Sequence, residues 1–119
     1  MKDRKEFIYT IKPTRLAMLT DGGTVEENGI VGEHFNYLQD LSAEGTVLMA
    51  ARTLTTGPDS FGIVIFYARD EEEAQAIVAA DPAVAQGVMQ AALFPFRIAL
   101  MANQMTAVKA ANSSGSRSS

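Results

Sequence analysis

The sequence predicts a single α+β domain whose elements follow the order strand, helix, strand, strand, helix, strand. Three observations support this prediction. Four segments have the residue pattern of β-strands, two segments between them carry apolar residues at helical spacing, and each helical segment begins with a capping signature. The length of 119 residues suits one domain, and folding at this size buries enough surface for a single core.

Three of the four strands are expected in the first 70 residues of the chain. The first, Glu6–Lys12, alternates with a period of two and ends at Pro13, which has no backbone donor. Two more strands are predicted over Thr46–Leu54 and Ser60–Ala68. Their connector, Thr55–Asp59, contains Gly and Pro and has a length that is typical of a β-hairpin.

The first helix is predicted from Thr24 to Ala43, after a turn at Asp21–Gly23. Thr24 and Glu27 have the spacing of a capping box, in which a hydroxyl and a carboxylate satisfy free N–H groups at a helix start. Gly45 stands where a left-handed residue would end the helix. The apolar stripe of this helix consists of Ile30, Val31, His34, Phe35, Leu38 and Leu41.

The second helix and the last strand follow Ala68. Acidic residues at 70–73 favour a helix start, and the helix is expected to reach residue 80. Asp81-Pro82 then begins a short helical turn that extends to Gly87, because Asp at the N-cap and Pro at the first helical position are both favoured. Residues 88–101 form the last extended segment, with Pro95 at a bulge or an edge position. The order is that of the ferredoxin-like βαββαβ motif with a four-stranded antiparallel sheet.

The third predicted strand is apolar on both of its faces. Its sequence, Phe61–Tyr67, does not alternate as a strand with one wet face would. One layer of helices covers only one face of the sheet, so the other face needs a partner. A second copy of the same chain is the simplest partner, and we expect a homodimer.

Composition narrows the classes of function. Fourteen acidic and ten basic residues give a net charge of −4, which disfavours a nucleic-acid partner. No apolar run approaches the roughly 20 residues that span a bilayer, and the charged N-terminus lacks the apolar core of a signal peptide, so we expect a cytoplasmic protein without membrane contact. The absence of cysteine excludes disulfides and thiolate zinc sites. With one histidine in addition, we expect neither a metal nor a cofactor.

His34 and Asp81 are the candidate catalytic pair. Histidine is the side chain that exchanges protons near neutral pH, and His34 is the only one in the chain. Such a base works better with a carboxylate on its other ring nitrogen, and Asp81 lies at a break between helical pieces rather than on a solvated face. Each residue also has a structural interpretation. His34 fits a hydrogen-bonded core residue, and Asp81 fits an N-cap before Pro82.

Three motifs in series resemble those of the YCII-related family. The segment VGEHFNYL at 31–38, followed by Glu44-Gly45, is similar to the "His-x-x-x-Leu" helix and Gly-ended turn of that family. The segment at 81–87 resembles its "Asp-Pro-x-x-x-x-Gly" hallmark, and Phe94-Pro95-Phe96 resembles its last strand. The resemblance extends over residues 6–101. Each motif alone is weakly specific, but the three in the expected order are fairly specific.

The resemblance implies a dimeric α/β barrel, in which two ferredoxin-like sheets pack face to face. It also implies that His34 and Asp81 form the active-site pair. Most members of the family are uncharacterised, and a few are tied to dehydrochlorination of aromatic ring-cleavage intermediates or resemble muconolactone isomerases. At Ala50-Ala51 the sequence departs from the Ala-Gly-Pro that the family often has. In the family this Gly-Pro shapes the pocket wall, so the resemblance does not identify the substrate of this protein. The tail beyond residue 102 is not a family feature.

Three further side chains are candidates for substrate binding. Arg15 lies in a loop and Arg52 near a strand end, and either could bind an anionic substrate. Tyr9 could line a pocket and donate a hydrogen bond. Structural alternatives exist for all three, because surface arginines are usually solvated and amphipathic tyrosines often belong to the core.

The sequence therefore leaves three functional hypotheses for a ferredoxin-like domain at residues 1–102, which is followed by a polar tail at 103–119. The first is a cofactor-free enzyme that uses His34 and Asp81 for elimination, dehydrochlorination or isomerisation of a small organic acid or aromatic breakdown product. The second is a non-catalytic dimer that binds a small ligand or has a structural role. The third, haem binding through His34, fits a histidine paired to a carboxylate less well.

Overall fold

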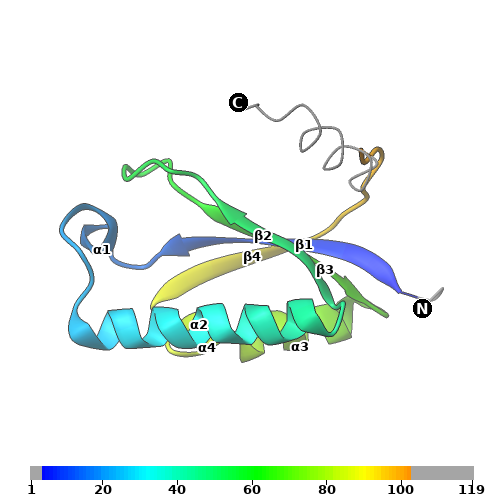
Figure 1. Ribbon diagram of the computed structural model, residues 1–119, viewed down its shortest axis with the longest axis horizontal. Helices are drawn as coiled ribbons and strands as arrows, with labels where there is room; N and C mark the ends of the chain where they lie inside the picture. Colours follow the sequence, from blue (N-terminus) through cyan, green and yellow to red (C-terminus); the bar gives the residue numbers. More distant parts are fainter. Residues whose placement is uncertain (1–3, 103–119) are drawn as a thin grey trace, which may run out of the picture.

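The computed structural model describes residues 4–102, which contain one antiparallel sheet of four strands in the order β2-β3-β1-β4. The helices α2, α3 and α4 all lie on the same face of this sheet (Figure 1). This is the α+β, ferredoxin-like arrangement that the sequence predicts. The strands are β1 (Lys5–Pro13), β2 (Val47–Arg52), β3 (Gly62–Ala68) and β4 (Met89–Pro95).

The longer helices begin at the capping residues that the sequence indicates. The Thr24 hydroxyl accepts a hydrogen bond from the Glu27 N–H at 3.0 Å, and the Glu27 carboxylate accepts one from the Thr24 N–H at 2.9 Å. The Asp70 carboxylate accepts from the Glu73 N–H at 2.8 Å. Gly45, with φ of 83°, follows the end of the first long helix. The helices are α1 (Ala17–Thr20), α2 (Val25–Ala43), α3 (Glu71–Ala80) and α4 (Pro82–Ala85).

Helix α1 lies between the end of the first strand and the turn at Asp21–Gly23, where the sequence predicts no helix. It has four residues and no side-chain cap, so it is too short to carry a periodic signal. Within residues 4–102, no helix combines the length and the apolarity that crossing a membrane requires.

The prediction of a last strand over residues 88–101 was wrong at its C-terminal end. β4 pairs with β1 as far as Pro95, which lies opposite Phe7. β1 itself begins two residues before Phe7, so little of the ladder remains for residues beyond the proline. The Phe96 N–H still donates to the Glu6 carbonyl at 3.1 Å, but the chain then leaves the sheet. The edge position expected for Pro95 is confirmed, because β4 is an edge strand.

The hairpin between β2 and β3 is longer than predicted. β2 ends at Arg52 and β3 begins at Gly62, so residues 53–61 lie outside both strands, whereas the sequence predicts a connector at 55–59. Hydroxyl groups of this hairpin bond to one another. Side-chain hydrogen bonding here competes with the regular ladder.

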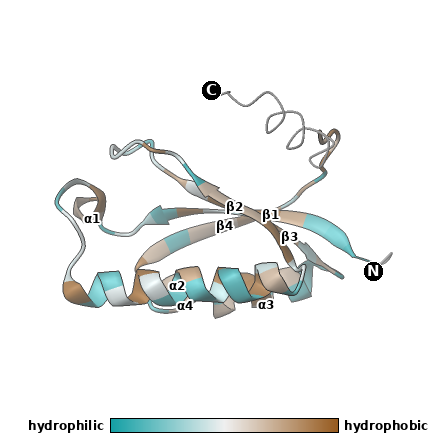
Figure 2. Cartoon of the chain, in the orientation of Figure 1, coloured by the Kyte–Doolittle hydropathy of each residue, from teal (hydrophilic) through white to brown (hydrophobic). Residues whose placement is uncertain are grey.

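The core lies between the sheet and the helices. Phe7 is opposite Phe66, and Tyr9 is opposite Val64, so these four side chains share the helix-facing side of β1 and β3. The Phe66 ring meets Tyr9 edge-on, with 5.7 Å between centroids. In Figure 2 hydrophobic and hydrophilic residues alternate along α2, as its packing on one side requires. The buried cluster comprises Phe7, Tyr9, Ile11, Leu38, Val47, Val64, Phe66, Ala68 and Ala74.

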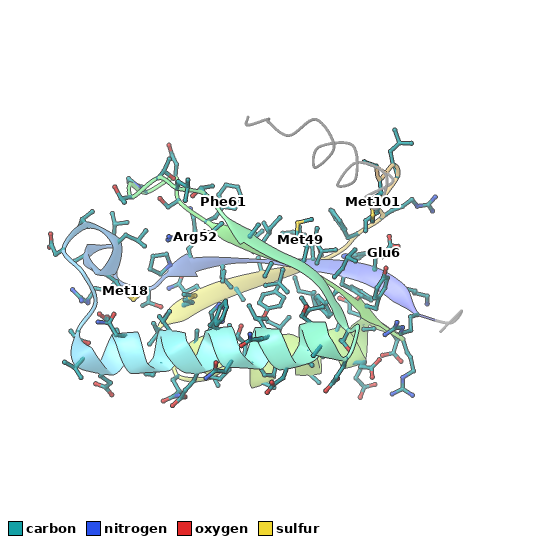
Figure 3. The ribbon with its side chains drawn as sticks, in the orientation of Figure 1. Glu6, Met18, Met49, Arg52, Phe61 and Met101 are labelled. Carbon is teal, nitrogen blue, oxygen red and sulfur yellow. The ribbon has the colours of Figure 1, made fainter. Side chains whose placement is uncertain are left out.

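The opposite face of the sheet is apolar and carries no helix among the described residues. Ile8 pairs with Ile65 and with Phe94 on this face, and Met49 pairs with Ile65. Met49 and Phe94 are 48% and 49% exposed. Figure 3 shows Met49 and Phe61 on the side of the sheet away from α2. Such a patch is typical of an interface.

Candidate active site

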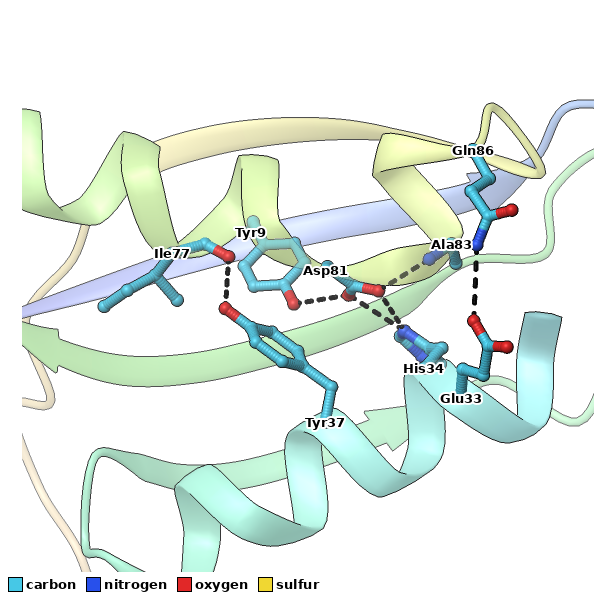
Figure 4. A network of polar contacts seen from close by, with 8 residues as sticks. All are labelled: Tyr9, Glu33, His34, Tyr37, Ile77, Asp81, Ala83 and Gln86. Atoms are coloured by element: carbon cyan, nitrogen blue, oxygen red, sulfur yellow. Dashed lines mark hydrogen bonds and ion pairs between the residues drawn. The ribbon is translucent and has the colours of Figure 1, made fainter.

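His34 lies on α2, and its side chain points toward the junction of α3 and α4. It lies one helical turn from Ile30 and from Leu38, and all three are buried. The His34 Nδ1 is 2.8 Å from each oxygen of the Asp81 carboxylate (Figure 4). The structure therefore brings together the two residues that the sequence singles out, across 47 positions of the chain.

Asp81 lies at the junction of α3 and α4. It is the C-cap residue of α3 and the N-cap residue of α4, and its Oδ1 accepts a hydrogen bond from the Ala83 N–H at 3.0 Å. The residue has no exposed surface. The N-cap interpretation and the histidine-partner interpretation thus both hold, because the same carboxylate serves the two donors.

Tyr9 supplies a third donor to this carboxylate. Its hydroxyl donates to Asp81 Oδ2 at 2.7 Å, and the side chain is fully buried. Burial, and then the charge of Asp81, raise the pKa of the Tyr9 phenol far above its usual value, so the hydroxyl stays protonated. Tyr9 does not line the cavity described below. The structure places Tyr9 behind Asp81, in the core.

The hydrogen bonds determine which nitrogen of His34 is free. A carboxylate only accepts hydrogen bonds, so Nδ1 carries a proton that it donates to Asp81, and the lone pair of the neutral ring lies on Nε2. Among residues 4–102, Nε2 has no hydrogen-bond partner. The ring is thus held in one tautomer.

A cavity of about 550 Å³ adjoins His34. Its walls come from α2, from the β2–β3 hairpin and from α1, which contributes Met18 and Leu19. Aromatic side chains of Phe35 and Phe61, both more than 40% exposed, stand on these walls. This volume and mixture of apolar and polar walls suit a small organic ligand. In the part of the chain that the structure describes, no three His, Cys, Asp or Glu residues are grouped as metal ligands.

The two candidate arginines have different surroundings. The Arg15 guanidinium binds both oxygens of Glu27, at 2.7 and 2.9 Å, and these bonds raise the pKa of Arg15 and lower the pKa of Glu27 to about 2. Arg15 does not line the cavity. Arg52 lines it, carries its only full charge, and makes no ion pair within residues 4–102. Of the two, only Arg52 lines the cavity.

A second tyrosine completes the surroundings of the pair. The Tyr37 hydroxyl donates to the Ile77 carbonyl at 2.6 Å and joins α2 to α3 (Figure 4). Burial, followed by the negative charges of Asp81 and Glu44, raises the pKa of Tyr37 to about 12.

Two features of the site were not predicted from the sequence. They are the hydrogen bond from Tyr9 to Asp81 and the cavity wall made by the β2–β3 hairpin, and neither has a local sequence signal.

Comparison with known protein families identifies the family of this chain. A model of the YCII-related domain matches residues 8–97. The chain belongs to the YCII-related family. The match includes His34 and Asp81; it begins within β1 and ends two residues beyond β4. No curated protein matches this YCII-related chain.

Several solved structures match this chain, and two of them illustrate the shared fold. The first is 5-chloro-2-hydroxyhydroquinone dehydrochlorinase from Burkholderia phenoliruptrix in complex with 2,5-dihydroxybenzoquinone, with a TM-score of 0.56 and 17% identity, covering 76% of this chain and 93% of that chain. The second is an uncharacterized protein of Thermotoga maritima, with a TM-score of 0.50 and 11% identity, covering 79% and 99%. At these identities the likeness concerns the fold.

Proposed function

We propose that this YCII-related protein is a cofactor-free enzyme in which His34 is the general acid–base and Asp81 orients it. The observation that carries the proposal is the bond from His34 Nδ1 to Asp81 on a ring that also forms part of a cavity wall. The proposed substrate is a small organic acid or aromatic breakdown product, and the proposed reactions are elimination, dehydrochlorination and isomerisation.

The chemistry needs one group that takes and returns a proton. Nε2 removes a proton from the substrate, and the imidazolium that forms is stabilised by the Asp81 carboxylate. In a dehydrochlorination, the electron pair left by that proton expels chloride, and the imidazolium passes the proton to solvent. In an isomerisation, it returns the proton to another carbon. A dehydrochlorinase on the same fold in Burkholderia phenoliruptrix supports the first reaction.

The charge of the cavity supports an anionic substrate. Among residues 4–102, Arg52 contributes the only full charge on the cavity wall, and neither Asp nor Glu lines it. A guanidinium without an internal partner binds a carboxylate or phenolate oxygen well. We therefore assign Arg52 to substrate binding, and we leave Arg15 in its bond with Glu27.

We also propose that the protein forms a homodimer. The uncovered sheet face, with Met49, Ile65 and Phe94, is the surface that a second copy would cover. The same apolar character predicts a partner from the sequence alone. Pairing of this face leaves the His34 layer, on the other side of the sheet, free for ligand.

A chloride-release assay tests the enzyme proposal. With 5-chloro-2-hydroxyhydroquinone, the wild-type protein is expected to release chloride, and His34→Gln is expected to lower the rate about 100-fold or more. Glu33→Gln is the matched control, because Glu33 is an exposed neighbour on α2 whose side chain contacts Gln86. Its rate should equal that of the wild type. Equal rates for the wild type and His34→Gln would contradict a catalytic role for His34.

The alternative function is a non-catalytic, ligand-binding or structural dimer, and the near-complete burial of His34 favours it. It predicts that 2,5-dihydroxybenzoquinone binds without any chloride release from the chlorinated compound. It also predicts that His34→Gln mainly lowers thermal stability, because buried Asp81 loses one of its donors. Binding measured beside chloride release therefore separates the two functions.

A further inference from the structure

Three hydroxyl groups form a chain on the cavity wall, where the β2–β3 hairpin leaves the sheet. Thr53, Thr55 and Ser60 all line the cavity. The Thr55 hydroxyl donates to Thr53 Oγ1 at 2.9 Å, and Thr55 Oγ1 lies 2.9 Å from Ser60 Oγ. Ser60 is 5% exposed, which places one end of the chain in the interior.

Counting protons sets the direction of this chain. A hydroxyl has one proton to donate and two lone pairs that accept. Thr55 uses its proton on Thr53, so the bond between Thr55 and Ser60 requires Ser60 as the donor. The order of donation is therefore Ser60 to Thr55 to Thr53.

The Thr53 hydroxyl, the last of the three hydrogen-bonded hydroxyl groups, keeps a proton that it does not donate to any of the described residues. Thr53 Oγ1 accepts from the Thr55 hydroxyl and also from the Phe61 N–H at 3.2 Å, so both of its lone pairs are engaged. No acceptor for the Thr53 proton lies within the part of the chain that the structure covers. Each bond in such a chain polarises the next, which makes the terminal O–H a stronger donor.

We propose that the Thr53 hydroxyl is a ligand-binding donor, specific for an anionic oxygen of a carboxylate or phenolate in the cavity. Arg52 lines the same cavity and supplies the positive charge, whereas Thr53 supplies a directed hydrogen bond. Figure 3 labels Arg52 and Phe61 at the base of the hairpin, with Met18 on the side of α2. The inference rests on the proposed function, because it uses the same cavity and names the group on the ligand that is recognised.

Binding of benzoate, the smallest aromatic carboxylate, tests the inference. Thr53→Val keeps the shape of the side chain and removes the hydroxyl, so the dissociation constant for benzoate should rise about 10-fold or more. Thr53→Ser keeps the hydroxyl and should remain within threefold of the wild type. Thr56→Val is the matched control, because Thr56 is an exposed threonine of the same hairpin that does not line the cavity. It should leave affinity unchanged.

Substitution of Thr55, the middle hydroxyl of the three, should have an intermediate effect on benzoate binding. Thr55→Val removes the donor that orients Thr53. The dissociation constant for benzoate should therefore rise by less than in Thr53→Val and by more than in Thr56→Val. Benzyl alcohol, which has the same ring without the charge, should bind all of these variants within threefold of one another. Heteronuclear NMR titration gives both the dissociation constants and a check that each variant is folded.

Three outcomes would overturn the inference: benzoate affinity equal in Thr53→Val and the wild type, an equal loss for benzyl alcohol, or no perturbation of the protein by benzoate. None of them decides the proposed function. Chloride release and its dependence on His34 are measured separately, with a different compound. Conversely, loss of benzoate affinity in Thr53→Val with no chloride release by the wild type would support the subsite and contradict the proposed dehydrochlorination.

Discussion

The two faces of the sheet are built from alternate residues of the same strands, yet only one face is complete. On the helix-covered face, Tyr9, His34 and the Ala83 N–H converge on Asp81, and every donor has its acceptor. On the other face, apolar side chains such as Met49 remain about half exposed. Within the described residues, the His34–Asp81 pair is therefore held by contacts of a single chain, whereas the open face is the surface for which we propose a partner.

The largest expected effect on stability comes from removing the Asp81 carboxylate, on which the hydrogen bonds of the helix-covered face converge. Asp81→Ala leaves three buried donors without an acceptor, so the free energy of unfolding should fall by about 3–5 kcal/mol. Asp70→Ala is the matched control, because Asp70 is also an N-cap aspartate but is exposed, and it should cost about 1 kcal/mol. Urea denaturation measures both. Similar losses in the two variants would mean that Asp81 acts as a cap and little else.

The open face is tested by placing a charge on it. Met49→Lys puts an ammonium group at the centre of the proposed contact, and the dissociation constant of the dimer should rise at least 100-fold, by roughly 3 kcal/mol. Val25→Lys is the control, because Val25 is 90% exposed at the start of α2, away from this face. Sedimentation velocity reports the masses. A wild-type monomer at micromolar concentration would remove the dimer altogether.

Tyr9→Phe removes one donor from the complete face and keeps the ring in the core. Because Asp81 retains two donors, the loss of stability should be about 1 kcal/mol. The freed lone pair makes the carboxylate a stronger acceptor for His34, so the Nδ1–H proton resonance should move downfield. An unmoved resonance would show that Tyr9 packs in the core without influencing the pair.

The smallest effect is expected at the edge of the helical layer, where Arg15 binds Glu27. The hydrogen bonds from Arg15 and, next, from the Thr24 N–H lower the pKa of Glu27 from an ordinary 4.5 to about 2. The contribution of these bonds to stability is therefore complete above pH 4.5 and is lost as the pH falls toward 2. Glu27→Gln should flatten this part of the curve of Tm against pH, and it should leave Tm near pH 7 slightly lower. Both side chains border solvent, and added salt should weaken the effect.

Elements defined by neighbouring residues were predictable. The starts of α2, α3 and α4 follow from Thr24, Asp70 and Asp81, because each cap bonds within three residues along the chain. The strand order along the chain follows from alternation and from turn residues. The end of β4 was not predictable, because it depends on where its neighbour β1 begins.

The candidate site was predictable only in part. His34 stands out as the single histidine. The break between helical pieces made Asp81 a candidate partner, but the residues left a structural interpretation open, and the family resemblance was what implied the pair. The place of Tyr9 behind Asp81, across 72 positions, depends on the register of β1 against the helices. The bond between Arg15 and Glu27 depends on the path of the α1 segment.

The sequence by itself determined the α+β class, the helix caps, the apolar stripes and the identity of the one histidine, since these depend on forces that act over a few residues. Only the tertiary structure decided which donors surround Asp81, which arginine faces the cavity and in which direction the hairpin hydroxyls donate. Those choices arise from packing between distant segments, where a shift of one residue in register turns a side chain to the other face of the sheet.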